Sequence, residues 1–180
     1  KGIRKVSGKK EKVFGKARTV KTISGDWAKP VEALEKTEPG DILVINAGGD
    51  ELAVWGELAT NSAINKGVKA IIIDGGVRDI SDIRDLGFPV WAKYITPEAG
   101  EPKGYGEIGS EIRCGGVKIN NGDYILADED GVVVIDKKEV DEMLNRAQMV
   151  YENEERVREE IKNNSTLSEV LELDKWEEKK

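Results

Sequence analysis

The sequence contains no histidine, and this absence excludes several kinds of active site at once. Histidine is the side chain that titrates near neutral pH without any perturbation. It is also the usual base that activates a catalytic serine or cysteine, so Ser-His and Cys-His nucleophile pairs are excluded. Any chemistry must therefore come from carboxylates, arginine, lysine, tyrosine or a bound metal ion.

Cysteine is almost as scarce, because Cys114 is the single example in the chain. One cysteine cannot form an internal disulfide bond, and no histidine is present to act as its base. Its neighbours Gly115 and Gly116 place it in a stretch that resembles a hairpin. A buried, unreactive thiol is therefore expected.

Long apolar runs are also missing. The run Val68–Ile73 is among the longest, and Lys69 interrupts it. A membrane-spanning helix needs roughly 20 apolar residues, and no signal-peptide pattern opens the sequence. We therefore expect no membrane partner and a cytoplasmic location.

The chain carries a formal net charge of -7, and its basic residues concentrate near the N-terminus. Proteins that bind single-stranded nucleic acid interleave such charges with aromatic side chains, on which the bases stack. That interleaving is absent around the basic residues, which are Lys5, Lys9, Lys10, Lys12 and Lys16. Nucleic acid is not expected as a partner.

The chain has 180 residues, of which 38% are hydrophobic and 35% are charged. This composition supplies enough apolar material for one core of ordinary size and too little for two. We expect one domain over residues 1–162, with its core at about 14–155. Residues 163–180 are expected to form a charged C-terminal tail.

The first half of the sequence alternates strand and helix patterns, which is typical of parallel βαβ units. Compact β-branched runs predict buried strands, and Pro30 marks the start of a short helix that reaches about Lys36. Gly67 marks the end of a helix that follows Gly56. The strands are expected at 13–24, 41–46, 68–73 and 88–94, with an extended piece at 52–55 and a helix at 79–86.

The pattern changes after Thr96, where glycine and proline become frequent. Strands are expected at about 111–119, 124–127 and 132–135, in an antiparallel arrangement. Asn121-Gly122 predicts a hairpin turn, and residues 128–131 predict another tight connection. A long charged helix at 137–162 and a short helical segment from about Ser165 follow. The sequence thus predicts an α/β fold with a parallel part, an antiparallel part and a long helix.

The pair Arg78-Asp79 is the first candidate for chemistry. It follows a predicted strand and the flexible pair Gly75-Gly76, so it should lie at the carboxyl end of a parallel strand, where α/β sheets bind ligands. An aspartate there can hold Mg²⁺ or Mn²⁺, and an adjacent arginine can bind a carboxylate through two hydrogen bonds. The alternative is an aspartate that starts a helix and forms a surface ion pair.

Residues 56–59 form the second candidate. A glycine turn before a helix leaves backbone N–H groups directed outward at the positive end of the helix dipole, which binds carboxylate or phosphate. Glu57 could act as an acid or base, or orient a metal-bound water. It could equally be a favourable negative charge in the first helical turn.

Five motifs occur in order along the sequence, namely GELA at 56–59, DGGVRD at 74–79, CGGVKI at 114–119, NGD at 121–123 and ADEDGVVVI at 127–135. Together they resemble the RraA-like family, which includes the 4-hydroxy-4-methyl-2-oxoglutarate (HMG) and 4-carboxy-4-hydroxy-2-oxoadipate (CHA) aldolases. The resemblance covers about Phe14 to Glu155. It implies a swivelling β/β/α fold that assembles as trimers or paired trimers (hexamers), with active sites between subunits. Family members usually begin with a further helix before the strand at Phe14, which this sequence lacks.

The resemblance also implies roles for individual residues. Active aldolases of the family carry an acidic residue, twenty intervening residues and then Arg-Asp, which Glu57, residues 58–77 and Arg78-Asp79 match. Asp79 would then ligate Mg²⁺ or Mn²⁺, Arg78 would hold the oxo-acid, and Glu57 would act through water. The substrate would also contact backbone amides of Gly56, Glu57, Leu58 and Ala59. A glutamate from the C-terminal helix of a neighbouring subunit contributes in the family, and Glu154 is its nearest counterpart, with Glu155 as the alternative.

The activity implied is cleavage of a short 2-oxo acid by a metal-dependent lyase. A divalent ion bound to the carboxylate and ketone stabilises the pyruvate enolate that forms as the C–C bond breaks. Oxaloacetate decarboxylation passes through the same enolate. The alternative is a non-catalytic, RraA-type protein that inhibits ribonuclease E by binding it. That branch typically loses the aspartate after the arginine, so the presence of Asp79 favours catalysis.

Overall fold

The computed structural model describes residues 2–177, with side chains described up to residue 175. The chain forms two compact units, one ending at residue 137 and the other beginning at residue 138. The predicted division into a domain of residues 1–162 and a tail of residues 163–180 stays a prediction. Within the described residues, no helix is long and apolar enough to cross a membrane.

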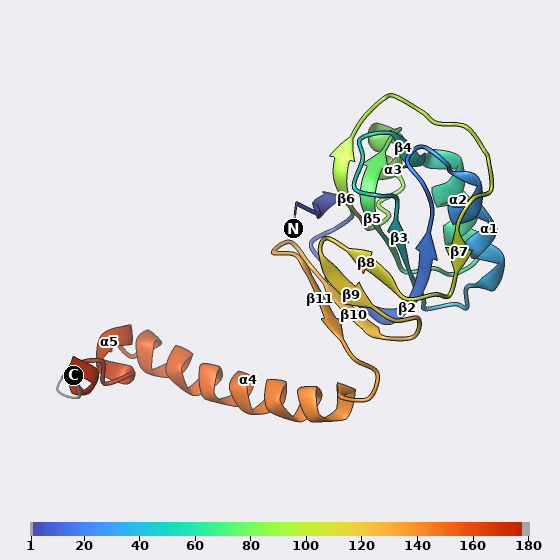
Figure 1. The fold of residues 1–180 in the computed structure, drawn as a ribbon. Coiled ribbons are helices and arrows are strands. Elements are labelled where there is room, and N and C mark those ends of the chain that lie inside the picture. Colours follow the sequence, from blue (N-terminus) through green and yellow to red (C-terminus); the bar gives the residue numbers. More distant parts are fainter. Residues whose placement is uncertain (1, 178–180) are drawn as a thin grey trace. The chain divides into compact units, whose positions relative to one another are not determined.

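The first unit contains eleven strands and three α-helices among its described residues, and Figure 1 shows their arrangement. The strands are β1 (Arg4–Ser7), β2 (Val13–Lys21), β3 (Ile42–Asn46), β4 (Ala53–Trp55), β5 (Ala70–Val77), β6 (Val90–Ile95), β7 (Glu107–Ile108), β8 (Ile112–Cys114), β9 (Val117–Ile119), β10 (Tyr124–Ala127) and β11 (Val132–Ile135). The helices are α1 (Ala28–Ala33), which continues into the 3-10 helix η1 (Leu34–Lys36), α2 (Glu57–Asn65) and α3 (Ile80–Asp85).

The main sheet has the strand order β1-β6-β5-β3-β2-β10-β11. Strands β6, β5, β3 and β2 are parallel to their neighbours in this series. Strand β2 pairs with β10 over Val13–Lys16 and with β3 over Ala17–Lys21, so it joins the antiparallel part of the sheet to the parallel part. The predicted α/β fold with these two parts is confirmed.

The parallel strands are buried on both faces, and alternate residues face opposite layers. Leu43 and Ile45 of β3 pack in a core with apolar residues of α1, η1, α2 and α3. Ile42 and Val44 of the same strand pack in a second core with residues of β8, β9 and β10. The unit therefore has a layer of helices, the parallel sheet and a layer of antiparallel strands, as the β/β/α prediction requires (Figure 1).

Cys114 lies in the second core and is 5% exposed. Its burial, with a smaller contribution from the negative charge of Asp74, raises the pKa of the thiol to about 12. The expected burial of the cysteine is confirmed.

Three local predictions need correction. Strand β5 continues through Gly75 and Gly76 instead of ending before them, because the backbone of Glu51 and Leu52 packs against Gly76 and leaves no room for a side chain. Asn121-Gly122 does not close a hairpin, since β9 pairs with β8 while β10 pairs with β2 and β11. Strand β1 was not expected at all.

The second unit contains the long helix α4 (Val140–Lys162), followed by α5 (Leu167–Val170) and α6 (Asp174–Glu177). Thr166 and Glu169 form a capping box at the start of α5. Leu167 and Leu171 line a groove with Val157 and Ile161 of α4, so the short helix packs back on the long one. Both the long helix and the helical segment after Ser165 are confirmed.

Candidate functional site

Arg78 and Asp79 lie directly after β5, at the carboxyl end of the central parallel strands. The amide of Arg78 donates to the carbonyl of Trp55 at 3.0 Å, which holds the end of β5 against β4. Asp79 precedes α3 and has a φ of 55°, in the left-handed region that few residues other than glycine adopt. Asp79 is the N-cap residue of α3 and forms an ion pair with Arg78, as the helix-starting alternative expected, although its side chain makes no capping hydrogen bond.

Gly56 lies beside this pair and precedes α2 in extended backbone, with a φ of -155°. A Cβ atom at Gly56 would lie 2.6 Å from Oδ2 of Asp79 and 3.2 Å from Cγ and Nε of Arg78. A side chain at Gly56 would therefore displace the carboxylate of Asp79. Glycine permits this close approach, whereas the backbone angles themselves suit any residue.

The carboxylate of Asp79 is held by two contacts. Its Oδ2 atom accepts a hydrogen bond from the amide of Glu57 at 3.2 Å and lies 3.5 Å from Nε of Arg78. Its Oδ1 atom has no hydrogen-bond or ion-pair partner within residues 2–177. The side chain is 31% exposed, so Oδ1 is the oxygen that remains for a ligand.

The first turn of α2 is fixed by Thr60. Its hydroxyl accepts a hydrogen bond from the indole Nε1 of Trp55 at 2.9 Å and donates to the carbonyl of Gly56 at 2.9 Å. The carboxylate of Glu57 accepts a hydrogen bond from the side-chain amide of Asn61, one turn further along. The amides of Leu58 and Ala59 lie in the same first turn, where N–H groups lack acceptors within the helix.

A cavity of about 300 Å³ opens beside these residues. Arg78 and Asp79 lie on its wall together with Gly56, Leu58 and Ala59 of the α2 segment. The rest of the lining comes from α1 and its preceding residue, from β4, and from the loop after β6. These further lining residues are Trp27, Val31, Ala53, Val54, Trp55, Ser62 and Ala99.

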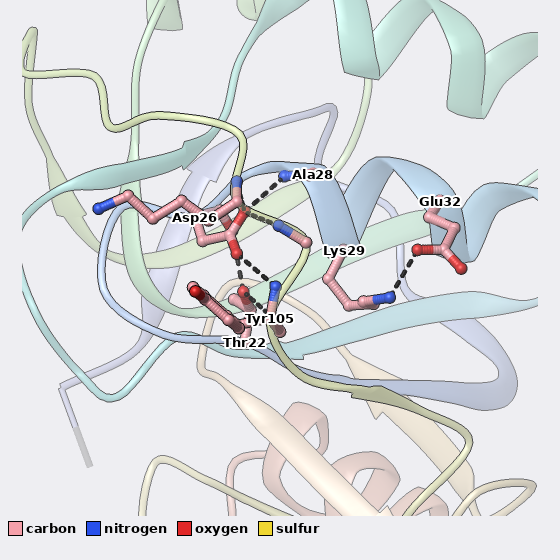
Figure 2. A network of polar contacts seen from close by, with 8 residues as sticks. Thr22, Asp26, Ala28, Lys29, Glu32 and Tyr105 are labelled. Carbon is pink, nitrogen blue, oxygen red and sulfur yellow. Dashed lines mark hydrogen bonds and ion pairs between the residues drawn. The ribbon is translucent and has the colours of Figure 1, made fainter.

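The loop that carries Ala99 is fastened to the start of α1 by Asp26, as Figure 2 shows. Asp26 is buried, with 1% of the residue exposed. Its carboxylate accepts four hydrogen bonds from backbone amides. Trp27 adds a fifth link, because its Nε1 atom donates to the carbonyl of Gly100 at 3.2 Å. The four amides belong to Ala28 at 3.1 Å, Lys103 at 2.9 Å, Gly104 at 3.1 Å and Tyr105 at 2.7 Å.

These hydrogen bonds set the charge of Asp26. Burial alone would raise the pKa of its carboxyl group, but the hydrogen bonds from the four amides outweigh burial and lower the pKa below its ordinary value of 3.8. The carboxylate therefore stays ionised at neutral pH. The loop that carries the lining residue Ala99 is thus held by the buried charge of Asp26, which does not itself line the cavity.

A sequence model of the RraA-like family, described as Aldolase/RraA, matches residues 1–134 of this chain. The chain belongs to this family. An uncharacterized protein of Methanocaldococcus jannaschii is 40% identical over 175 residues, which cover 96% of this chain and 84% of that protein. The relationship that the sequence motifs indicated is confirmed.

Relatives of this RraA-like chain carry two kinds of name. A Thermus thermophilus protein named 4-hydroxy-4-methyl-2-oxoglutarate aldolase is 29% identical over 129 residues, covering 71% of this chain and 78% of that protein. A solved structure described as the RNA-processing inhibitor RraA from Thermus thermophilus superposes with a TM-score of 0.68 at 28% identity. That superposition covers 74% of this chain and 80% of the other chain.

The oxygen donors of the site suit a hard divalent cation. Within the described residues, no cluster of three or more cysteine, aspartate or glutamate side chains could hold a metal ion. Among the described residues that line the cavity of the RraA-like chain, Asp79 is the one carboxylate. Mg²⁺ is commonly bound by one or two carboxylates with water and substrate oxygens completing its shell, so Asp79 fits this role.

The predicted site residues divide between the two units. Gly56, Leu58, Ala59, Arg78 and Asp79 all line one cavity, and Glu57 lies in the same turn as Gly56. Glu154 and Glu155 lie on α4 in the second unit, where both are paired with Arg158. Their predicted contribution to the site of a neighbouring subunit stays a prediction.

Sequence reasoning missed the residues that build the far wall of the cavity. Trp27, Val31 and Ala99 carry no motif, and Asp26 joins the start of α1 to the loop that carries Ala99. The hydrogen bond between Asp26 and Tyr105 spans 79 positions in the sequence. No local sequence pattern predicts a hydrogen bond between residues so far apart in the chain.

Proposed function

We propose that this chain is a divalent-metal-dependent lyase that cleaves a short 2-oxo acid, by aldol cleavage of an HMG- or CHA-type substrate or by decarboxylation of oxaloacetate. The observation that carries this proposal is the position of Asp79. Gly56 and the amide of Glu57 hold its carboxylate beside Arg78, at the wall of a cavity of about 300 Å³. The name of the aldolase relative from Thermus thermophilus supports the same class of reaction.

Arg78 binds and orients the substrate. Its side chain is 45% exposed and lines the cavity, and its amide bond to Trp55 fixes the backbone from which it extends. A guanidinium group binds a carboxylate through two parallel hydrogen bonds, which fixes the plane of the 2-oxo acid. The positive charge of Arg78 also offsets the free-energy cost of removing the substrate carboxylate from water.

Asp79 holds the metal ion in this proposal. Its Oδ2 atom accepts the amide of Glu57, and its Oδ1 atom, which has no partner among the described residues, would hold Mg²⁺ or Mn²⁺. When bound, such an ion supplies Lewis-acid stabilisation of the negative charge that develops on the 2-oxo group during bond cleavage. The backbone amides of Leu58 and Ala59 add a positive dipole end to the same side of the cavity.

Glu57 moves a proton in this proposal. Its carboxylate is held by Asn61, so its position relative to α2 is fixed. Aldol cleavage requires removal of a proton from the hydroxyl group of the substrate, and a carboxylate can accept it through one water molecule.

Assembly as a trimer or hexamer is part of the proposal, with Glu154 or Glu155 reaching the site of a neighbouring subunit. The long helix α4 has no buried residue within this chain, and its apolar side chains Met143, Leu144 and Val150 are exposed. A helix of this kind suits contact with another chain. Light scattering of the full chain gives its oligomeric state.

The test is release of pyruvate from HMG, CHA and oxaloacetate by the purified full chain. We expect release that requires Mg²⁺ or Mn²⁺, stops on chelation and returns when the metal is restored. Lactate dehydrogenase and NADH report the pyruvate, and each acid is run without protein because oxaloacetate decomposes spontaneously. No release above that background from any acid would contradict the proposal.

The second candidate function is inhibition of a ribonuclease through protein binding, which the name of the superposed RraA structure supports. Such binding would use the outer surface of the protein, so it should not depend on Arg78 or Asp79 within the cavity. Inhibition of ribonuclease E by the unmodified chain, and equally by Asp79→Asn, would favour this function. Dependence of pyruvate release on Asp79 would favour the lyase.

A further inference from the structure

Thr60 is a fully buried polar residue of α2, and it does not line the cavity. Its hydroxyl group accepts a hydrogen bond from the indole Nε1 of Trp55 and donates one to the carbonyl of Gly56, both at 2.9 Å. An indole N–H group can only donate, and a carbonyl group can only accept. The directions of both hydrogen bonds therefore follow from the residue types, and the hydroxyl proton is directed at Gly56.

The carbonyl of Gly56 accepts two hydrogen bonds from Thr60, one from the hydroxyl and one from the backbone amide at 3.1 Å. This carbonyl and the N–H group of Glu57 belong to one planar peptide unit, in which the two groups point in opposite directions. Thr60 thus binds one side of the unit, and Oδ2 of Asp79 accepts the N–H group on the other side at 3.2 Å. Rotation of the peptide unit would break its contacts on both sides.

The same contacts also affect the strength of the hydrogen bond to Asp79. A hydrogen bond to a carbonyl group polarises its peptide unit and makes the N–H group of that unit a better donor. The two hydrogen bonds from Thr60 therefore strengthen the one from Glu57 to Asp79. Trp55 adds a second link, because its carbonyl accepts the amide of Arg78 at 3.0 Å. The residue that orients the hydroxyl of Thr60 thus also holds the end of β5, directly before Asp79.

We propose that Thr60 is a positioning residue for Asp79, which acts through the peptide unit between Gly56 and Glu57. Its hydroxyl keeps the amide of Glu57 directed at Oδ2 and so holds the carboxylate in one orientation. Each contact in this series lies within one chain and within the first compact unit, so it does not depend on how subunits assemble. The consequence for metal binding rests on the proposed lyase function, whereas the positioning itself needs no metal.

A purely structural role would give a different result. Thr60 also satisfies the indole N–H group of Trp55, which is 2% exposed, so loss of the hydroxyl costs stability in any case. Stability alone cannot separate the two roles. The amide of Glu57 can, because it is in the first turn of α2 and has no acceptor within that helix.

The first test is hydrogen exchange of the Glu57 amide, measured by NMR on the full chain without metal. Thr60→Val removes the hydroxyl and keeps the backbone hydrogen bond to Gly56. We expect exchange at Glu57 to become about tenfold faster. Thr60→Ser keeps a hydroxyl group and should exchange at close to the rate of the unmodified chain. An unchanged rate at Glu57 in Thr60→Val would overturn the proposal.

Two controls report on overall stability. The amide of Val44, in the centre of the main sheet, exchanges only through large opening of the fold. An equal increase at Val44 and Glu57 would show a general loss of stability and would also overturn the proposal. Thr37→Val is the matched variant, because the half-buried hydroxyl of Thr37 donates to the carbonyl of Leu34 at 2.8 Å, outside the cavity lining. It should leave exchange at Glu57 unchanged.

A second variant tests the role of Trp55 without leaving a buried donor unpaired. Trp55→Phe removes the indole N–H group, after which the hydroxyl of Thr60 is free to turn away from Gly56. Exchange at Glu57 should become faster, but by less than in Thr60→Val. Trp91→Phe is its control, because the buried indole of Trp91 donates to the carbonyl of Asp128 at 2.9 Å. An equal increase in both tryptophan variants would contradict the specific role of Trp55.

The second test is the affinity for Mn²⁺, measured by electron paramagnetic resonance. Groups that hold a metal ligand in place contribute about 10- to 100-fold to metal affinity. We expect Thr60→Val to lower the affinity by about tenfold and Thr60→Ser to restore it. Faster exchange at Glu57 with unchanged affinity for Mn²⁺ would overturn the role of Thr60 in metal binding.

The two tests separate this proposal from the lyase function. Faster exchange at Glu57 in Thr60→Val, together with no pyruvate release by the unmodified chain, would overturn the lyase function and support the positioning of Asp79. Pyruvate release by the unmodified chain, together with unchanged exchange in Thr60→Val, would overturn the positioning alone. Unchanged exchange and no pyruvate release would overturn both.

Discussion

The carboxylate of Asp79 accepts a hydrogen bond from the backbone amide of Glu57 at 3.2 Å, which joins two motifs that are 22 residues apart. The contact is possible because Gly56 has no side chain to separate the end of β5 from the start of α2. The fixed spacing between the acidic residue and Arg-Asp thus has a physical basis. It matches the length of one helix and one parallel strand.

Asp79→Asn should remove metal binding and leave the fold intact. Asparagine tolerates the left-handed backbone at this position, and its carbonyl oxygen can still accept the amide of Glu57. We expect the affinity for Mn²⁺, measured by electron paramagnetic resonance, to fall by more than about 100-fold. Asp82→Asn, exposed on α3, is the control for net charge, and unchanged Mn²⁺ affinity in Asp79→Asn would refute this role.

Gly56→Ala should damage the site through a single methyl group. The added carbon would meet Oδ2 of Asp79 at 2.6 Å, although the φ of Gly56 suits alanine. Displacement of the carboxylate by about 1 Å should reduce kcat/KM by about 100-fold, with a small change in thermal stability. Asn65→Ala, exposed on the same helix, should leave both quantities unchanged. Full activity in Gly56→Ala would show that the position of Asp79 is unimportant.

Arg78→Lys should weaken substrate binding more than it slows the chemical step. Lysine keeps the positive charge but cannot form two parallel hydrogen bonds to a carboxylate. We expect KM for the 2-oxo acid to rise by about tenfold, with a smaller change in kcat. Steady-state kinetics measure both, and Arg113→Lys, at an exposed position of β8, serves as the control. An unchanged KM would mean that Arg78 does not hold the substrate.

Asp26→Asn should destabilise the protein in a manner that depends on pH. The pKa of Asp26 is lower in the folded state, so its charge contributes stability that is present above pH 3.8 and lost as the pH falls through the folded pKa. Near neutral pH we expect the variant to lose about 2–4 kcal/mol of unfolding free energy, because an amide group would face the backbone donors. Urea denaturation from pH 7 to pH 2.5 measures the difference between the two proteins.

The difference in unfolding free energy between the two proteins should shrink as the pH falls from 3.8 through the lower pKa of the folded state, where Asp26 becomes protonated. Asp82→Asn provides a comparison at an exposed aspartate, where little change is expected at any pH. A difference that stayed constant across the whole range would show that the charge of Asp26 is not what holds the loop.

Cys114 should resist alkylation in the native protein. Its thiol has a pKa of about 12 because it is buried, so very little thiolate is present at pH 8. We expect iodoacetamide to modify the protein only after unfolding in guanidinium chloride, as measured by intact-protein mass spectrometry. Rapid modification of the folded chain would contradict the burial of Cys114.

Much of the fold could be predicted from local patterns. The β-branched run at 41–46 became β3, and the antiparallel strands β10 and β11 have the predicted bounds. Such patterns succeed because strands buried on both faces require continuous apolar residues. Gly75-Gly76 misled the prediction, since glycine usually breaks a strand and here permits close packing within β5.

The polar end of the cavity could also be predicted, because Gly56, Arg78 and Asp79 each follow a strand and come before a helix at the same edge of the sheet. The apolar half could not. Trp27 and Ala99 lie 72 positions apart, and the loop between β6 and β7 brings them together without any regular element of its own. Contacts through a loop leave no periodicity in a sequence.

The anchorage of that loop has a consequence for how the cavity can change. Asp26 binds the backbone amides of Lys103 and Tyr105, a group that every residue except proline provides. The side chains at these positions are consequently free of the anchoring contact. Ala99 lines the cavity on the same loop, so exchange of its side chain would change the lining while the main chain stays where Asp26 holds it and the sheet that carries Arg78 is unaltered.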